Sequence, residues 1–153
     1  MSHVAKINLQ ITNLDALANA CARLGLELVK GQKTYRWYGR SVGAYRRADA
    51  VAAPDGKCEH TIRVKGNPNA YEIGLVKRAD GKAGYELVWD HWQGGYGLCE
   101  KVMYGKYDRR MPANADKLKD WYTAEVTRQK MSRQGFQVQA VQGQGKVVVT
   151  CVG

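Results

Sequence analysis

Short stretches in which polar and apolar residues alternate recur along this chain, and they constrain its fold more than any other feature. Alternation with a period of two is typical of a β-strand with one buried face. Residues 6–11 and 61–64 are clear examples. The segments predicted as strands are 6–11, 26–29, 61–64, 71–76, 85–89, 136–141 and 146–152.

Two other stretches carry the apolar spacing of a helix. The first begins after Thr12 and ends at Gly25. Thr12 is the predicted N-cap, because Asp15 follows it at the three-residue spacing of a capping box. The second should begin near Asn114 and end at Gly135. The residues expected to be buried on the two helices are Leu14, Leu17, Cys21 and Leu24, and Leu118, Trp121, Tyr122 and Val126.

The predicted order is therefore β-α-β, β-β-β, α-β-β. Short strands with only two helices favour an α+β fold, in which both helices pack on one face of an antiparallel or mixed sheet. A ferredoxin-like form is one option. At 153 residues the chain has the usual length of one domain, and we expect residues 1–153 to form it, with basic aromatic insertions near 30–58 and 94–113.

The net charge is the unusual feature of the composition. The chain has 24 Lys and Arg against 14 Asp and Glu, a formal charge of +10. Such an excess attracts polyanions such as nucleic acids. No run is long and apolar enough to cross a membrane, the start lacks the apolar stretch of a signal peptide, and the four cysteines form no C-x-x-C pair. We therefore expect a cytoplasmic protein with reduced thiols.

Residues 30–47 combine six cations with four aromatic residues and contain no acid. Single-stranded nucleic acids bind to such segments, because bases stack on aromatic faces and cations neutralise phosphates. The residues predicted to bind are Tyr35, Arg36, Trp37, Tyr38, Arg40, Tyr45, Arg46 and Arg47. The alternative is a strand that buries Tyr35 and Trp37 on one side, since alternate residues point in opposite directions. A second cluster of this composition consists of Lys101, Tyr104, Lys106, Tyr107, Arg109 and Arg110.

The cysteine, histidine and acidic residues form no known catalytic motif in the sequence. Cys58, His60, His91 and Cys99 are possible zinc ligands, but their spacing fits no ordinary finger. Asp90 next to His91 could orient an imidazole, yet no motif supplies a nucleophile. We therefore predict no enzyme activity, no metal and no cofactor.

Several segments together resemble the family called domain of unknown function 1257, which includes the plastid hypothetical reading frame 35 proteins and relatives in bacteria and phages. They are the opening Met1-Ser2-His3, the strands at 71–75 and 85–92, and the helix exit at 134–136. The resemblance spans nearly the whole chain and implies one domain in a bacterial or phage-infected cell. The family has no established reaction or cofactor to carry over, and this chain departs from its pattern in the longer stretches at 30–58 and 94–113.

Taken together, these features predict a non-enzymatic protein that binds RNA or single-stranded DNA. No helix-turn-helix or finger motif predicts a reader of duplex sequence. The alternative is a protein-interaction module or inhibitor that docks on an acidic cellular or phage protein, since Trp, Tyr and Arg are also enriched in protein interfaces. Composition alone does not separate the two.

Overall fold

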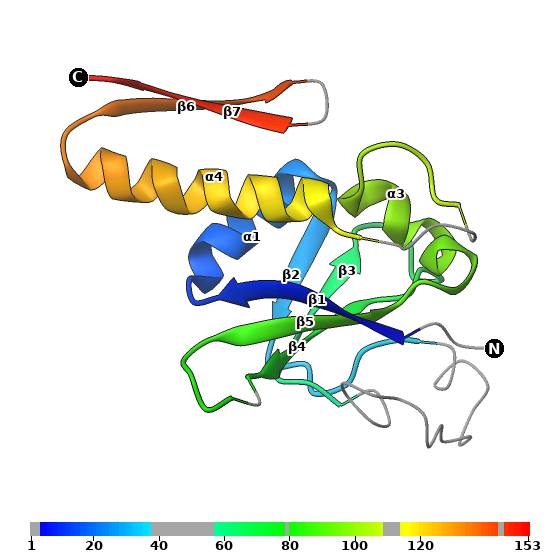
Figure 1. Ribbon diagram of the computed structural model, residues 1–153. Helices are drawn as coiled ribbons and strands as arrows, with labels where there is room; N and C mark the ends of the chain where they lie inside the picture. The colour runs from blue at the N-terminus through cyan, green and yellow to red at the C-terminus, as the bar shows by residue number, and fades with distance from the viewer. Residues whose placement is uncertain (1–3, 38–56, 79, 109–113, 144–145) are drawn as a thin grey trace.

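The computed structural model describes residues 4–37, 57–78, 80–108, 114–143 and 146–153, and these form an α+β fold (Figure 1). The elements in chain order are β1 (Val4–Ile11), α1 (Leu14–Arg23), β2 (Leu26–Lys30), β3 (His60–Val64), β4 (Ile73–Lys77), β5 (Tyr85–Asp90), η2 (Trp92–Gly97), α3 (Leu98–Val102), α4 (Asp116–Arg133), β6 (Gln137–Gly143) and β7 (Lys146–Val152). The predicted fold class is confirmed.

Strands β1 to β5 form an antiparallel sheet in the order β1-β5-β4-β3-β2. Helix α1 carries the chain from one edge strand to the other, and β2 to β5 then follow each other as neighbours. A ferredoxin-like fold repeats the β-α-β unit, whereas this sheet contains one such unit followed by a meander. The topology supports the α+β class and adds nothing in favour of the ferredoxin-like form.

Helix α1 is fixed at its start by Asn13, whose side chain accepts a hydrogen bond from the Ala16 N–H at 2.9 Å. The predicted N-cap, Thr12, is therefore wrong by one residue. The backbone N–H groups of Thr12 and Asn13 instead donate to the Tyr122 hydroxyl on α4, at 3.1 and 3.2 Å. These bonds tie the beginning of α1 to the middle of α4.

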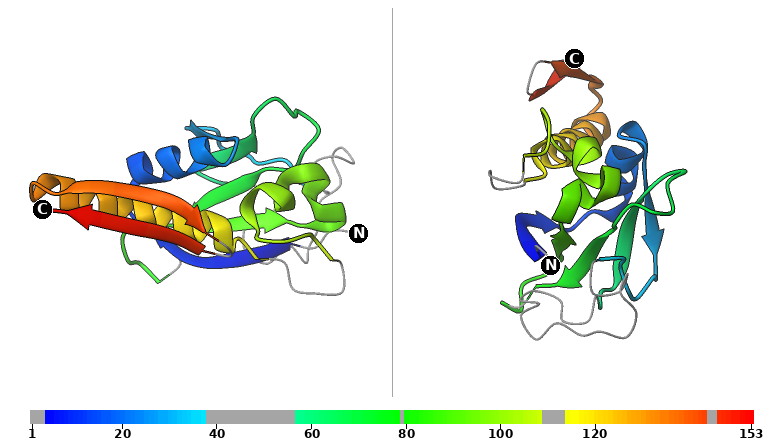
Figure 2. Two further views of the ribbon diagram at one scale, coloured as in Figure 1. Left: turned by 90° about the horizontal axis from the view of Figure 1, so that it is seen from above. Right: turned by 90° about the vertical axis from the view of Figure 1, so that its right-hand side faces the viewer.

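Helix α4 is covered on two sides, because it lies between the sheet with α1 and a separate hairpin formed by β6 and β7 (Figures 1 and 2). Leu118, Trp121 and Tyr122 are buried as predicted, and Val126 is partly buried. The hairpin packs against α4 through small apolar side chains such as Ala140 and Val147. The molecule therefore has three layers: sheet, helices and hairpin.

The sheet buries apolar side chains on both faces. Leu87 and Trp89 point to the helices, whereas Val88, between them on β5, belongs to a second cluster with Tyr35, Trp37 and Cys58. Because neighbouring residues of a strand point to opposite faces, this second cluster lies on the face away from the helices. The insertion expected near 94–113 contains helix α3, and the turn η2 leads into it.

Candidate functional site

The structure buries the two aromatic rings at the centre of the predicted nucleic-acid segment. Tyr35 has 0% and Trp37 1% of its surface exposed. A base stacks only on an accessible ring face, so the predicted binding role of Tyr35 and Trp37 is corrected here to packing on the outer face of the sheet. Burial also raises the pKa of the Tyr35 hydroxyl. The alternative is right about the burial of these two rings, although residues 35–37 form no regular strand.

The remaining residues of the two predicted clusters have different positions. Lys101 and Lys106 are exposed. The Tyr104 hydroxyl donates to Asp120 at 2.8 Å, and burial together with this bond raises the pKa of Tyr104 to about 12. The Tyr107 ring lies beside Gly94, where a Cβ would be 3.3 Å from it. Tyr38, Arg40, Tyr45, Arg46, Arg47, Arg109 and Arg110 lie outside the described residues.

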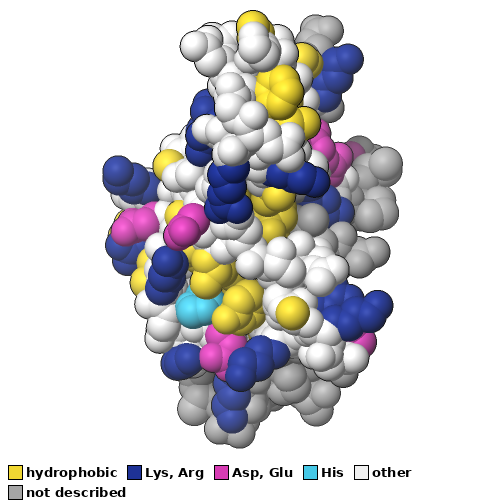
Figure 3. All heavy atoms as spheres, turned by 90° about the vertical axis from the view of Figure 1, so that its left-hand side faces the viewer, with side chains coloured by type: hydrophobic (Ala, Val, Ile, Leu, Met, Phe, Trp, Pro, Cys, Tyr) yellow, Lys and Arg dark blue, Asp and Glu magenta, His cyan; other side chains and the backbone are white. Residues whose placement is uncertain are grey.

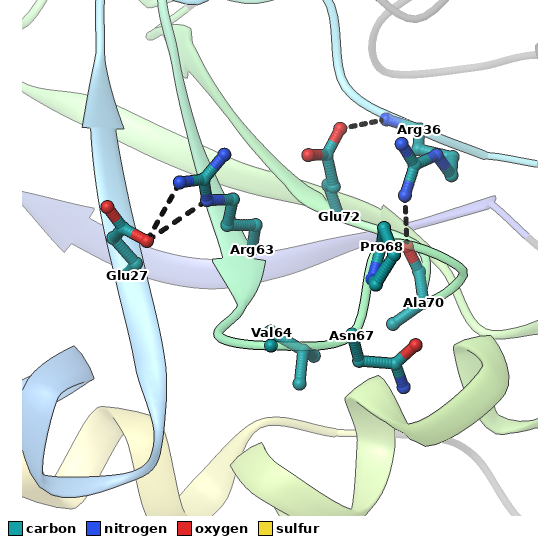
Figure 4. Close-up of a pocket in the computed structure, with 9 residues that line it drawn as sticks. Glu27, Arg36, Arg63, Val64, Asn67, Pro68, Ala70 and Glu72 are labelled. Carbon is teal, nitrogen blue, oxygen red and sulfur yellow. Dashed lines mark hydrogen bonds and ion pairs between the residues drawn. The ribbon is translucent and has the colours of Figure 1, made fainter.

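Arg36 borders a hollow of about 300 Å³ at the end of β3 (Figure 4). Its Nη1 donates to the Ala70 carbonyl at 3.2 Å, which anchors the guanidinium beside the loop that follows β3. Arg63 lines the same hollow, and its Nε and Nη2 donate to Glu27 at 3.1 and 2.9 Å. The hollow thus has a guanidinium from each of two distant segments.

Glu72 fixes the segment that carries Arg36. One carboxylate oxygen accepts from the Arg36 backbone N–H at 2.7 Å and from the Gln32 amide at 3.1 Å. The side chain is nearly buried, with 6% exposed. A buried carboxylate is stable only where hydrogen bonds compensate its lost hydration, so Glu72 holds the backbone in place.

A second, more open hollow of about 490 Å³ lies where α1, α3 and α4 meet. Arg23 lies over the Trp121 ring at 4.6 Å and donates to Glu125 at 3.0 Å, so its charge is already paired. Lys101 and Lys117 line the hollow as well, and neither forms an ion pair with another residue of the described ranges. Glu100 is an acidic residue of the lining.

The two hollows adjoin at the start of β2. Lys65 follows Val64, which lines the first hollow, and its N–H donates to the carbonyl of Gly25, which lines the second, at 3.1 Å. The Lys101 ammonium lies 3.5 Å from the position that a Cβ on Gly25 would take. We call the cations along this path the basic track: Arg63, Lys65, Lys101 and Lys117.

An exposed aromatic ring stands next to this path on a left-handed turn. Residues Gln93 to Tyr96 in η2 have φ values of 54°, 67°, 62° and 52°. Non-glycine residues rarely adopt this conformation, and it costs about 1–2 kcal/mol per residue. Asn67, which lines the first hollow, donates to the Tyr96 carbonyl at 3.2 Å.

The Tyr96 side chain is 49% exposed, and its ring packs edge-on against Tyr71 with the ring centres 5.1 Å apart. A strained turn therefore holds this ring toward solvent. Sequence reasoning missed Tyr96, Arg63 and Lys65 as possible binding residues. The glycines around Tyr96 indicated only a turn.

The possible zinc ligands do not come together. Cys58 belongs to the cluster on the outer face of the sheet, whereas Cys99 is in the core on the helix face. Among the residues that the structure describes, no group of three or more His, Cys, Asp or Glu side chains is placed to hold a metal.

The described part of the chain also contains no helix with the length and apolar character needed to cross a membrane.

No protein-family model, curated protein or solved structure matches this chain. The resemblance to the domain of unknown function 1257 family therefore stays a prediction.

Proposed function

We propose that this protein binds single-stranded nucleic acid, RNA or DNA, along the basic track, and that it does so without catalysing a reaction. The main support for this proposal is the open hollow of about 490 Å³, which Lys101 and Lys117 line without forming an ion pair with any described residue. Cations that are not neutralised within the protein are the ones that release counterions from phosphate on binding.

The path has the arrangement that a flexible strand needs. Lys65 is exposed beside Gly25, and Lys101 and Lys117 continue from it toward α4. A single strand can follow cations on several different elements because it bends freely, whereas a duplex is stiff. Lys65, Lys101 and Lys117 contact phosphates in this proposal.

Tyr96 takes the stacking role that sequence reasoning gave to Tyr35 and Trp37. Its ring is exposed, and the contact with Tyr71 and the strained turn limit its motion. Stacking of a base on an aromatic side chain contributes about 1–3 kcal/mol. Backbone strain is common at functional sites, and in this proposal the strained turn serves to present the Tyr96 ring to a base.

The test is a fluorescence-anisotropy titration of labelled single-stranded RNA, single-stranded DNA and duplex DNA at several salt concentrations. Lys101→Glu with Lys117→Glu should weaken single-strand binding at least about tenfold, and should reduce the salt slope by about 0.7 for each phosphate that the variant no longer neutralises. The matched control is Lys77→Glu with Lys82→Glu, which changes the charge equally. Both control lysines are exposed at the opposite end of the sheet.

Equal weakening by both double variants would mean that net charge alone drives the binding, and the proposed surface would be wrong. Tyr96→Ala should weaken binding about tenfold while Tyr96→Phe keeps it, since Phe retains the ring. If no nucleic acid binds even at low salt, the proposal fails. Recovery of one acidic protein after nuclease treatment, abolished in the Lys101/Lys117 variant, would then support the protein-docking alternative.

A further inference from the structure

The hairpin of β6 and β7 exposes most of the apolar surface of the described residues. Of the five large hydrophobic side chains that these residues expose, four come from the hairpin or the residue before it: Phe136, Val141, Val148 and Val152. Val141 and Val148 are 59% and 45% exposed and lie opposite each other on the two strands. Figure 3 shows mostly apolar and uncharged side chains at the top of the molecule, where the hairpin lies.

The hairpin also has open strand edges. It forms a two-stranded sheet of its own, so one edge of each strand has no described strand beside it (Figure 2). Proteins usually protect such edges with charged residues, proline or a bulge, because an open edge pairs with other strands. Residues 147–153 of the β7 side contain no charge and no proline, and Val147, Val148, Val149, Thr150 and Val152 are β-branched.

The charge of this surface points to the partner. Residues 136–153 contain one charged residue, Lys146, in a chain with a net charge of +10. A nucleic acid or an acidic protein would find almost no cations here. Two copies of the chain repel each other over most of their surface, and the hairpin is where they can meet with few like charges.

We propose that two copies of this chain associate by antiparallel pairing of their β7 strands, which joins the two hairpins into one four-stranded sheet. Such an interface is isologous and closes after two copies. Strand β7 is favoured over β6 because most of its residues are β-branched, which suits strand pairing, whereas β6 ends in a glycine.

The arrangement of charge selects the register. If the two-fold axis passes through Val149, each Lys146 faces the partner's Val152, and the two ammonium groups are separated by about 20 Å. Parallel pairing in register would place Lys146 of one copy directly beside Lys146 of the other, and like charges at facing positions destabilise a sheet. In the antiparallel register Val148 faces the partner's Thr150.

The test uses sedimentation velocity of the full chain over a concentration series, with charge variants at this pair. Val148→Lys with Thr150→Lys places like charges opposite each other and should raise the dimer dissociation constant about tenfold. Val148→Lys with Thr150→Glu places opposite charges across the interface and should restore the dimer. Both residues are exposed in the single chain, and circular dichroism confirms that each variant folds.

The matched control is Val141→Lys with Gln139→Lys, on the same face of the hairpin but on β6. It adds the same charge and should disturb the dimer less than the β7 variant. Greater loss with the β6 pair, or a Lys/Glu variant that stays as weak as the Lys/Lys variant, would refute this register.

A second measurement does not depend on affinity. Val149→Cys, with Cys151→Ser to remove the exposed native thiol, places two thiols across the axis, where facing Cα atoms of paired strands lie about 5.5 Å apart and allow a disulfide. Mild oxidation should give a covalent dimer, and Val141→Cys in the same background should give much less. A chain that stays monomeric at about 100 μM, far above the working range of specific complexes, and does not cross-link would overturn the proposal.

Discussion

Gly74→Ala tests directly whether Tyr35 is packed on the sheet or free to bind. Gly74 lies on β4, between Thr61 of β3 and Val88 of β5. A Cβ at this position would lie 2.5 Å from Cδ1 and 3.0 Å from Cε1 of Tyr35, and 3.1 Å from Cβ of Cys58. Carbon atoms normally pack at about 3.5–4.0 Å, so the ring has to move by about 1 Å.

Overpacking of this kind costs about 1–3 kcal/mol. Alanine in a strand recovers about 0.5–1 kcal/mol relative to glycine. The net loss of unfolding free energy is therefore up to about 2.5 kcal/mol, with a central value of about 1 kcal/mol, which corresponds to a fall in Tm of about 2–4 °C for a chain of this length. Urea and thermal unfolding followed by circular dichroism measure both quantities.

The same substitution in a Tyr35→Val background completes a double-mutant cycle. The shorter side chain leaves room for the new methyl group, so Gly74→Ala should cost less there than in the wild type. An equal cost in both backgrounds, or no cost in either, would show that the ring does not rest on Gly74, and the burial of Tyr35 would lose its support.

Four further predictions concern other parts of the molecule. Gln93→Gly should raise the unfolding free energy by about 0.5–1 kcal/mol, measured in urea, because φ of 54° strains a residue that has a Cβ. Trp37→Ala should lower it by about 3–5 kcal/mol, because the ring is 1% exposed; an unchanged urea midpoint would contradict this. Iodoacetamide at pH 8 should modify exposed Cys151 but not buried Cys21 or Cys99, as peptide mass analysis would show. Burial raises the pKa of the Cys21 and Cys99 thiols from 9.0 to about 12. The unfolded chain therefore loses these protons at a lower pH than the folded chain, so the stability that the thiols contribute is complete below pH 9.0 and is lost as the pH rises toward 12. An unfolding free energy that stays constant over that range would contradict this.

The order of strands and helices followed from the sequence because its causes are local. Alternation, helical spacing and glycine stops act within a few residues, and they predicted each main strand as well as α1 and α4. The errors arose where two local solutions compete. Thr12 and Asn13 are both residue types that suit an N-cap. The Tyr122 hydroxyl accepts hydrogen bonds from the backbone N–H groups of both, although Tyr122 is 109 residues from Asn13 in the sequence.

The candidate site was less predictable because distant segments build it. The period of two at Tyr35 and Trp37 indicated that they share a face, but their burial depends on Cys58 and Val88, which local patterns do not connect with them. The basic track likewise combines lysines from a loop, α3 and α4. Nucleic acid as the partner therefore stays a prediction from composition, whereas the structure changed the residues that we propose to contact it.

Salt should separate the two proposals, because it acts on them in opposite directions. Binding of a single strand through lysines releases counterions, so added salt weakens it. The β7 pairing contains almost no charge, and added salt screens the repulsion between two copies of +10, so the dimer should become tighter. Sedimentation and anisotropy over the same salt series test both expectations. If salt weakens both, the two copies are held together by nucleic acid rather than by β7, and nuclease treatment should then dissociate them.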